Sequence, residues 1–175
     1  YSGAHDVTPD YHGTYTASDN HGGSDSANLS ISYQDGHTLT GTAGNDTLVA
    51  GAGDNIINAG DGNDVLTAGN GNNTLHGDAG NDLLFSGAGN DVLDGGIGND
   101  TASFAHATAG VTVNLGQLGP QNTFGAGTDT LTAIENLVGS DFNDNLTGDN
   151  NSNIITGGLG NDILKGEGGD DFLIG

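Results

Sequence analysis

The amino-acid sequence predicts an all-β fold in which short parallel strands stack into a spiral, and three regularities carry that prediction. Between Gly41 and Ser103 the chain repeats every nine residues, and the repeat returns from Gly139 to Gly175. Within 41–103 the fourth residue of every unit is glycine, and the sixth is always Asp or Asn. The eighth residue is Leu or Ile in every unit but the last. A fixed period of this kind decides the architecture before local propensities are consulted.

Each nine-residue unit divides into a six-residue turn and a three-residue strand. Glycines in the turn permit positive φ and close approach between backbones. The middle residue of a three-residue strand points to one face and its two neighbours point to the other, so the single Leu or Ile points inward. One unit cannot bury that side chain alone, so units must stack, two to a coil. We therefore expect a flattened, right-handed parallel β-roll in which each turn lies over the second turn after it.

Stacking brings the sixth-position carboxylates of one edge together. These residues are Asp46, Asp64, Asp82 and Asp100. Successive coils of a parallel stack are only about 4.8 Å apart, so the four carboxylates repel one another strongly. A hard divalent cation between the turns removes this conflict, because calcium takes six to eight oxygen ligands from carboxylates and backbone carbonyls.

The opposite edge differs, because its sixth residues are Asn55, Asn73 and Asp91. An Asn side chain offers a neutral carbonyl oxygen without the charge that binds calcium tightly. The sequence therefore predicts one strong row of calcium sites and one weak or partly empty row.

The units, such as GTAGNDTLV and AGDGNDVLT, closely resemble those of RTX (repeats-in-toxin) proteins. That resemblance implies calcium ions held between stacked turns by sixth-position Asp side chains and by carbonyls of the glycine-rich positions. The implied ligands are Asp46, Asp64, Asp82, Asp100, Asp91, Asp144, Asp162 and Asp171, with the backbone of Gly44, Gly62, Gly80, Gly98, Gly89 and Gly160. It also implies export of an unfolded chain through a type I secretion apparatus, followed by folding in external calcium.

Composition supports a chain that needs a cation. There are 23 acidic residues against one basic residue, with 34 glycines and no Cys, Met or Trp. Such acidity argues against nucleic acids and anionic membranes as partners. Acidity with few aromatic residues is also typical of disorder, but the regular period favours a metal-dependent fold. No apolar run is long enough for a membrane span. The sequence contains neither H-E-x-x-H nor G-x-S-x-G, so we expect no catalytic site.

Residues 1–40 carry no repeat. Strands are expected near 13–18 and 26–33, joined by a turn at 20–23. They resemble the final antiparallel hairpin of a cadherin-like or immunoglobulin-like bacterial domain, which would make the parent protein an adhesin. The alternative is a cap on the first coil.

The repeat lapses over 104–138. Val111, Val113 and Leu115 alternate as a strand does, and Pro120 marks a turn. We interpret the segment as a linking insert that continues the spiral with irregular loops, and a projecting functional loop is the alternative. Four more units follow over 139–175, with Phe142 and Asn151 in place of the fourth-position glycine. Calcium geometry is therefore in question at those two turns.

The seventh position is often apolar although it should face outward. The residues are Ile56, Val65, Leu83, Val92, Ile154, Ile163 and Phe172. Singly exposed apolar residues are normal on proteins, whereas a contiguous face would pack against a neighbouring domain or another copy.

These observations lead to a functional hypothesis. The chain is expected to be a non-catalytic calcium-binding roll of a large secreted or surface-attached adhesin, folded only where calcium is abundant. One alternative is the C-terminal module of a secreted protease, lipase or epimerase. The other is a self-assembling surface-layer or filament protein.

Overall fold

A computed structural model describes residues 15–16, 27–30 and 38–175. These residues form short strands joined by turns, and none of them is helical. The strands are β1 (Tyr15–Thr16), β2 (Ala27–Ser30), β3 (Thr38–Thr40), β4 (Asp46–Val49), β5 (Ile56–Asn58), β6 (Val65–Thr67), β7 (Thr74–His76), β8 (Leu83–Phe85), β9 (Val92–Asp94), β10 (Thr101–Ser103), β11 (Thr112–Asn114), β12 (Gln121–Asn122), β13 (Thr128–Thr132), β14 (Asn136–Val138), β15 (Asn145–Thr147), β16 (Ile154–Thr156), β17 (Ile163–Lys165) and β18 (Phe172–Ile174).

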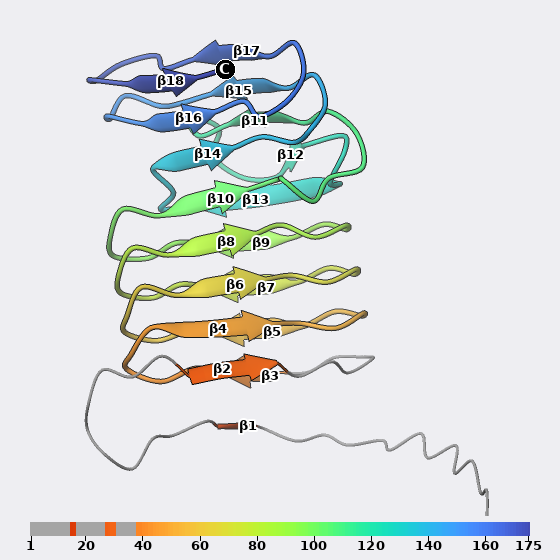
Figure 1. The fold of residues 1–175 in the computed structure, drawn as a ribbon, viewed down its shortest axis with the longest axis vertical. Helices are drawn as coiled ribbons and strands as arrows, with labels where there is room; N and C mark the ends of the chain where they lie inside the picture. The colour runs from red at the N-terminus through yellow and green to blue at the C-terminus, as the bar shows by residue number, and fades with distance from the viewer. Residues whose placement is uncertain (1–14, 17–26, 31–37) are drawn as a thin grey trace, which may run out of the picture.

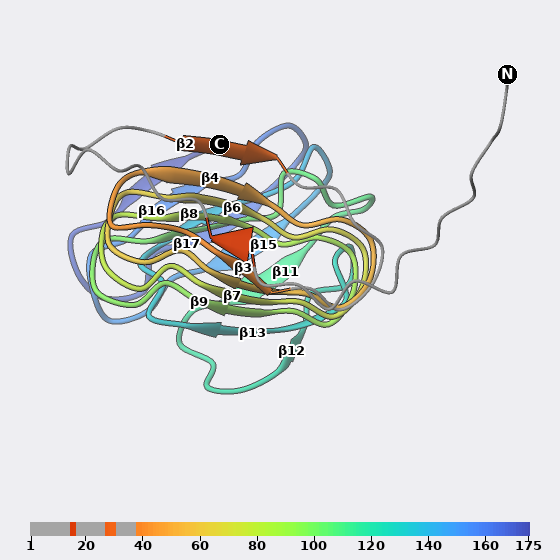
Figure 2. The same cartoon turned by 90° about the horizontal axis from the view of Figure 1, so that it is seen from below.

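The strands stack into the two faces of a roll. One face is an 8-stranded sheet in the order β18-β16-β14-β10-β8-β6-β4-β2. The other face holds a 7-stranded sheet, β1-β3-β5-β7-β9-β13-β12, and a 3-stranded sheet, β11-β15-β17. The coils lie one above another in Figure 1, and the view along the stack in Figure 2 shows their flattened outline. Among the described strands, only β12 and β13 pair antiparallel. The predicted all-β parallel roll is confirmed.

The register follows the period of two repeats per coil. Leu48 is opposite Leu66, and Leu66 is opposite Leu84. On the other face Ile57 is opposite Leu75. These inward side chains are at most 1% exposed, and they form one continuous core along the stack. Leu173 in the last described coil is 44% exposed, because no described strand lies above it.

The fourth-position glycines are required by the spacing of the coils. Gly62 and Gly80 adopt φ values of 132° and 145°, which L side chains rarely adopt. A Cβ at Gly62 would lie 2.7 Å from the carbonyl carbon of Gly44, and one at Gly80 would collide with the carbonyl of Gly62. At Gly62 and Gly80 the turns can therefore stack at strand spacing only because this position lacks a side chain.

The two described segments before residue 38 correct one prediction. β1 pairs parallel with β3, and β2 pairs parallel with β4 in the other sheet. They do not pair with each other as an antiparallel hairpin. The open backbone groups at the end of the roll are a template for added strands, and both segments extend the stack there. The turn expected at 20–23 lies outside the described residues.

The segment 104–138 adds to the stack in an order that differs from the chain. β13 pairs with β9 and β14 pairs with β10, so both continue the sheets below them. β11 precedes both in sequence but pairs with β15, and its Val113 is 1% exposed. Near the start of the segment, His106 stacks on Phe85, with 4.9 Å between ring centroids. The chain around β12 protrudes from the outline of the roll (Figure 2), and Leu118 just before it is 96% exposed.

Candidate metal centre

The sixth residues of the turns form two columns, one along each edge of the roll. We call the first the acid column, and it consists of Asp46, Asp64, Asp82, Asp100 and Glu135. We call the second the amide column, and it consists of Asn55, Asn73, Asp91 and Asp129. Each member lies directly before a strand or, for Asp46 and Asp129, at the start of one, so the parallel register of the strands sets the spacing of the side chains.

One oxygen of each acid-column carboxylate above Asp46 caps the backbone of the coil below. The N–H of Asp46 donates to Oδ1 of Asp64 at 2.7 Å, and the N–H of Asp64 donates to Oδ1 of Asp82 at 2.8 Å. The same bond links Asp82 to Asp100, and the N–H of Asp100 donates to Oε2 of Glu135. These bonds satisfy turn N–H groups that no strand pairing reaches, and they fix the orientation of each carboxylate.

The second oxygen of three of these carboxylates has no donor. Within the part of the chain that the structure describes, Oδ2 of Asp64, Asp82 and Asp100 is buried and has no hydrogen-bond partner. We call these atoms the open oxygens. Leaving a buried polar group without a partner costs about 1–3 kcal/mol, and more when the group is charged. Three stacked carboxylate oxygens fit a hard cation, because such ions prefer oxygen ligands.

The electrostatics of the column point the same way. Burial, helped by the nearby carboxylates of Asp82 and Asp46, raises the pKa of Asp64 to about 7 against the lowering effect of the Asp46 N–H. Burial likewise raises the pKa of Asp82 to about 6, and it raises the pKa of Asp100. The ionised forms are thus unfavourable here without a compensating positive charge.

Backbone carbonyls must complete any cation site in the roll. Among the described residues, no three His, Cys, Asp or Glu side chains converge as a metal-binding group. The amide column shows which carbonyls are near, because Nδ2 of Asn55 donates to the carbonyl of Gly53 at 2.7 Å. Gly53 holds the fourth position of its turn, as do the six glycines predicted to contribute backbone ligands. Five of those six have positive φ, namely Gly62, Gly80, Gly89, Gly98 and Gly160.

Three other predicted carboxylates have a hydroxyl donor of their own. Oδ2 of Asp46 accepts from the N–H of Thr42 at 2.6 Å and from its Oγ1 at 3.0 Å. Oδ2 of Asp91 accepts from Oγ of Ser86 at 3.3 Å. Asp144 accepts from the N–H and the Oγ of Ser140. Their turns therefore differ chemically from those with open oxygens, although the repeat pattern is the same.

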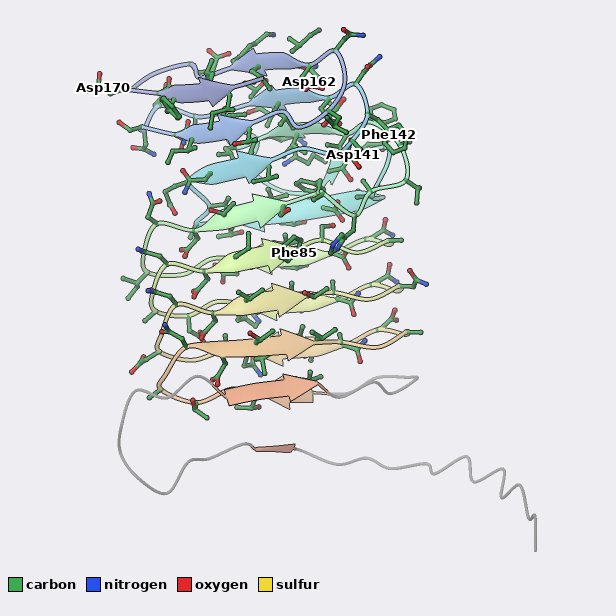
Figure 3. All side chains as sticks on the ribbon, in the orientation of Figure 1. Phe85, Asp141, Phe142, Asp162 and Asp170 are labelled. Carbon is green, nitrogen blue, oxygen red and sulfur yellow. The ribbon has the colours of Figure 1, made fainter. Side chains whose placement is uncertain are left out.

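The last two predicted carboxylates lie at the end of the stack. Asp162 and Asp171 are half-buried, and their Oδ1 atoms accept from the N–H groups of Asp144 and Asn153, each at 2.9 Å. Figure 3 shows that Asp170 lies at the edge opposite Asp141 and Phe142. Asp144 and Asp162 thus continue the edge of the amide column, whereas Asn153 and Asp171 continue the edge of the acid column.

Two column members come from the irregular segment, and the sequence reasoning missed both. Glu135 ends the acid column above Asp100, and Asp129 accepts from the N–H of Asp91 at 2.8 Å. Burial raises the pKa of Asp129 to about 6 and raises that of Glu135. A signal was present, because each carboxylate stands two residues before a buried leucine, as in the repeats.

The fifth residues form a second ladder, which was also missed. The N–H of Asn63 donates to Oδ1 of Asn45 at 2.8 Å, and the N–H of Asn81 donates to Oδ1 of Asn63 at 2.7 Å. These bonds run toward the coil below, whereas the sixth-position bonds run toward the coil above. The adjacent N–H groups of positions five and six are therefore capped from opposite sides, one by a side chain of the coil below and the other by a side chain of the coil above.

Together the fold and the columns define a cation-binding β-solenoid. The RTX calcium-binding nonapeptide repeat, a family pattern four copies long, matches residues 38–66, 67–102 and 138–173. These matches cover more than half of the chain, so the chain belongs to this family, and its repeats bind several calcium ions. A comparison with curated proteins gives no match. In the described residues there is no helix long and apolar enough to cross a membrane.

Proposed function

We propose that the chain is a non-catalytic structural module of a secreted or cell-surface protein, and that it folds when its stacked turns bind calcium. In this proposal Asp64, Asp82 and Asp100 supply the main carboxylates, and carbonyls of the glycine turns supply further oxygens. The other predicted aspartates contribute less, because a hydroxyl or solvent already satisfies them.

The open oxygens are the observation that carries the proposal. A carboxylate that spends one oxygen on the backbone and buries the other without a donor is unfavourable unless a cation binds there. Three such carboxylates follow one another in consecutive coils of one edge. When bound, calcium would supply the positive charge that this edge of the chain lacks.

Mass action makes folding depend on the compartment. Extracellular calcium modules bind with dissociation constants of about 10⁻⁴ to 10⁻³ M. A site filled at 100 times its dissociation constant adds about 2.7 kcal/mol of stability, and several sites add a whole domain's net stability. At the low free calcium of a cytosol the contribution vanishes. We propose that the chain stays unfolded for passage through a type I secretion apparatus and folds outside the cell.

The kind of parent protein is a separate matter. The preference for an adhesin rested on the sandwich-like hairpin, and the pairing of β1 and β2 with the roll removes that ground. The proposal is therefore confined to a structural module of a secreted or surface protein. We propose a non-catalytic module because the sequence contains neither a zinc-protease motif nor a serine-hydrolase motif.

Circular dichroism of the chain during a calcium titration tests the proposal. The titration runs from chelator to about 10 mM calcium, which brackets the dissociation constants of extracellular modules. We expect a cooperative gain of β signal with calcium and little gain with magnesium, which demands smaller octahedral sites. Full β structure in chelator, with no calcium bound on addition, would contradict the proposal.

A further inference from the structure

In the amide column the second side-chain atom of Asn55 and Asn73 has hydrogen-bond partners, whereas the open oxygens of the acid column have none among the described residues. Nδ2 of Asn55 donates to the carbonyl of Gly53 at 2.7 Å and to the carbonyl of Gly51 at 3.3 Å. Nδ2 of Asn73 donates to the carbonyl of Gly71 at 3.0 Å and lies 3.4 Å from that of Gly69. One side-chain nitrogen thus binds the second- and fourth-position carbonyls of its own turn.

The same nitrogens also bridge to the next coil. Nδ2 of Asn55 donates to Oδ1 of Asn73 at 3.1 Å, and Nδ2 of Asn73 donates to Oδ1 of Asp91 at 3.2 Å. Asn55 and Asn73 are 3% and 1% exposed, so these bonds are shielded from water. Each of these nitrogens contacts two backbone carbonyls and one side-chain oxygen of the coil above. A cation that bridged the two coils would contact the same oxygens.

The acid column has the opposite chemistry at the equivalent atom. Asp64 and Asp82 replace this nitrogen with a carboxylate oxygen, which repels carbonyls instead of bonding to them, and which has no donor among the described residues. Between the turns of Asn55 and Asn73 and those of Asp64 and Asp82, the difference is therefore one atom per turn, an amide nitrogen in place of a carboxylate oxygen.

We propose that the side-chain amides of Asn55 and Asn73 take the place of calcium ions, so that this stretch of the roll is built without metal. The inference rests on the proposed function, and it deepens it: calcium holds one edge, and amide hydrogens hold the other. A chain of this kind needs fewer ions for its length than one with Asp at every sixth position.

The variant Asn73→Asp tests the inference, and Asn72→Asp is its matched control. Asn73→Asp replaces the bridging nitrogen with an oxygen beside Asp91, which should create a cation site. Asn72→Asp makes the same change of residue and charge one position away, on an exposed side chain whose Oδ1 can still accept from the N–H of Asn90. Bound calcium per chain is measured by equilibrium dialysis at fixed free calcium, with circular dichroism to verify folding.

We expect Asn73→Asp to bind at least one more calcium ion per chain than the wild type and to need more calcium to fold. Asn72→Asp should bind the same number as the wild type. Equal binding by all three chains would overturn the inference while leaving the proposed function intact. Absence of calcium binding by the wild type would instead overturn the proposed function, and the inference with it.

The reverse exchange covers the case in which Asn73→Asp does not fold. Asp82→Asn keeps an Oδ1 that can accept from the N–H of Asp64 and converts an open oxygen to a donor. We expect it to bind fewer ions than the wild type and to retain its β signal in calcium. An unchanged calcium count, or loss of the fold in saturating calcium, would count against the amide as a substitute for the ion.

Discussion

At the scale of single residues, the two oxygens of an acid-column carboxylate have separate roles. Oδ1 of Asp82 accepts from the N–H of Asp64 and so belongs to the backbone network of the turns. Its Oδ2 is an open oxygen and is the atom that we propose binds the cation. In the proposed site the same side chain would couple the stacking of two coils to the binding of calcium.

Replacement of Asp82 should weaken calcium-dependent folding far more than replacement of an exposed aspartate. Asp82→Ala removes a proposed ligand between two pairs of coils, with a loss of about 2.7 kcal/mol for each ion that filled its site at 100 times the dissociation constant. Asp61→Ala removes the same charge from an exposed turn position. The calcium midpoint of the β signal should rise strongly for Asp82→Ala and little for Asp61→Ala. Equal midpoints would argue against Asp82 as a ligand.

Lowering the pH should stabilise the metal-free fold but should weaken calcium-dependent folding. The folded-state pKa values of Asp64 and Asp82 are raised from 3.8 to about 7 and about 6, so the metal-free fold binds extra protons. The contribution of these two groups to its stability is fully present below about pH 4 and is lost as the pH rises through 6 to 7. Calcium competes with those protons, so its midpoint should rise as the pH falls from 8 to 5. Titrations at several pH values measure both effects, and a midpoint independent of pH would contradict them.

At the scale of the turn and the strand, close approach of the backbones decides which residues are tolerated. Gly80 and Gly119 both have positive φ, but only Gly80 lies against the turn below. A Cβ at Gly119 would meet nothing within 4 Å among the described residues. A side chain at Gly80 would therefore clash with the adjacent coil, whereas there is space for a Cβ at Gly119.

Gly80→Ala should consequently destabilise the roll more than Gly119→Ala. Both variants incur the left-handed backbone penalty, about 1–2 kcal/mol for a residue with a Cβ. Gly80→Ala must also push two coils apart, because its Cβ meets the Gly62 carbonyl. Thermal unfolding in saturating calcium measures the difference. Similar losses in the two variants would show that stacking at this turn is looser than described.

The repeats could be predicted from the sequence, whereas the segments outside them could not. Burial of Leu48, Leu66 and Leu84 follows from a side chain that recurs every two units at one point of the coil. The positions of Glu135 and Asp129 depend on how β13 and β14 pair, and no local pattern fixes that pairing. The hairpin prediction for 1–40 was wrong for β1 and β2, because local strand propensity does not identify the partner strand.

The site could be predicted in outline for a similar reason. The period identified the columns, including the difference between Asp64 and Asn55. It could not show which carboxylates keep an open oxygen, because the donors that close the others stand at positions of no fixed residue type. Thr42 serves Asp46 from the second position of its unit, and Ser86 serves Asp91 from the first.

At the scale of the whole molecule, the formal charge of −22 opposes a compact state. Screening by simple salt relieves repulsion between exposed charges, since the Debye length is about 3 Å at 1 M. Screening cannot supply a partner for a buried oxygen. Ionic strength therefore acts on the repulsion between exposed charges, whereas bound calcium acts on the buried carboxylate oxygens.

High sodium chloride should accordingly fail to replace calcium. In chelator with about 1 M sodium chloride, where repulsion is largely screened, we expect the chain to contract without forming the roll. Calcium at millimolar concentration should produce both contraction and β signal. Size-exclusion chromatography with circular dichroism separates the two, and full β structure in sodium chloride alone would show that general repulsion was the main obstacle.

The segment 104–138 contains β11, β12, β13 and β14, and it leaves the alternation of the units between the two faces unchanged. β10 before the segment lies in the 8-stranded sheet and β15 after it lies on the opposite face, as consecutive units do, so Asp144 stands beyond the amide column and Asn153 beyond Glu135. Whether an odd or an even number of repeat units is gained or lost therefore decides on which side of the roll the later units lie. Gain or loss of two units leaves each column aligned, whereas gain or loss of one exchanges the two sides for all that follows.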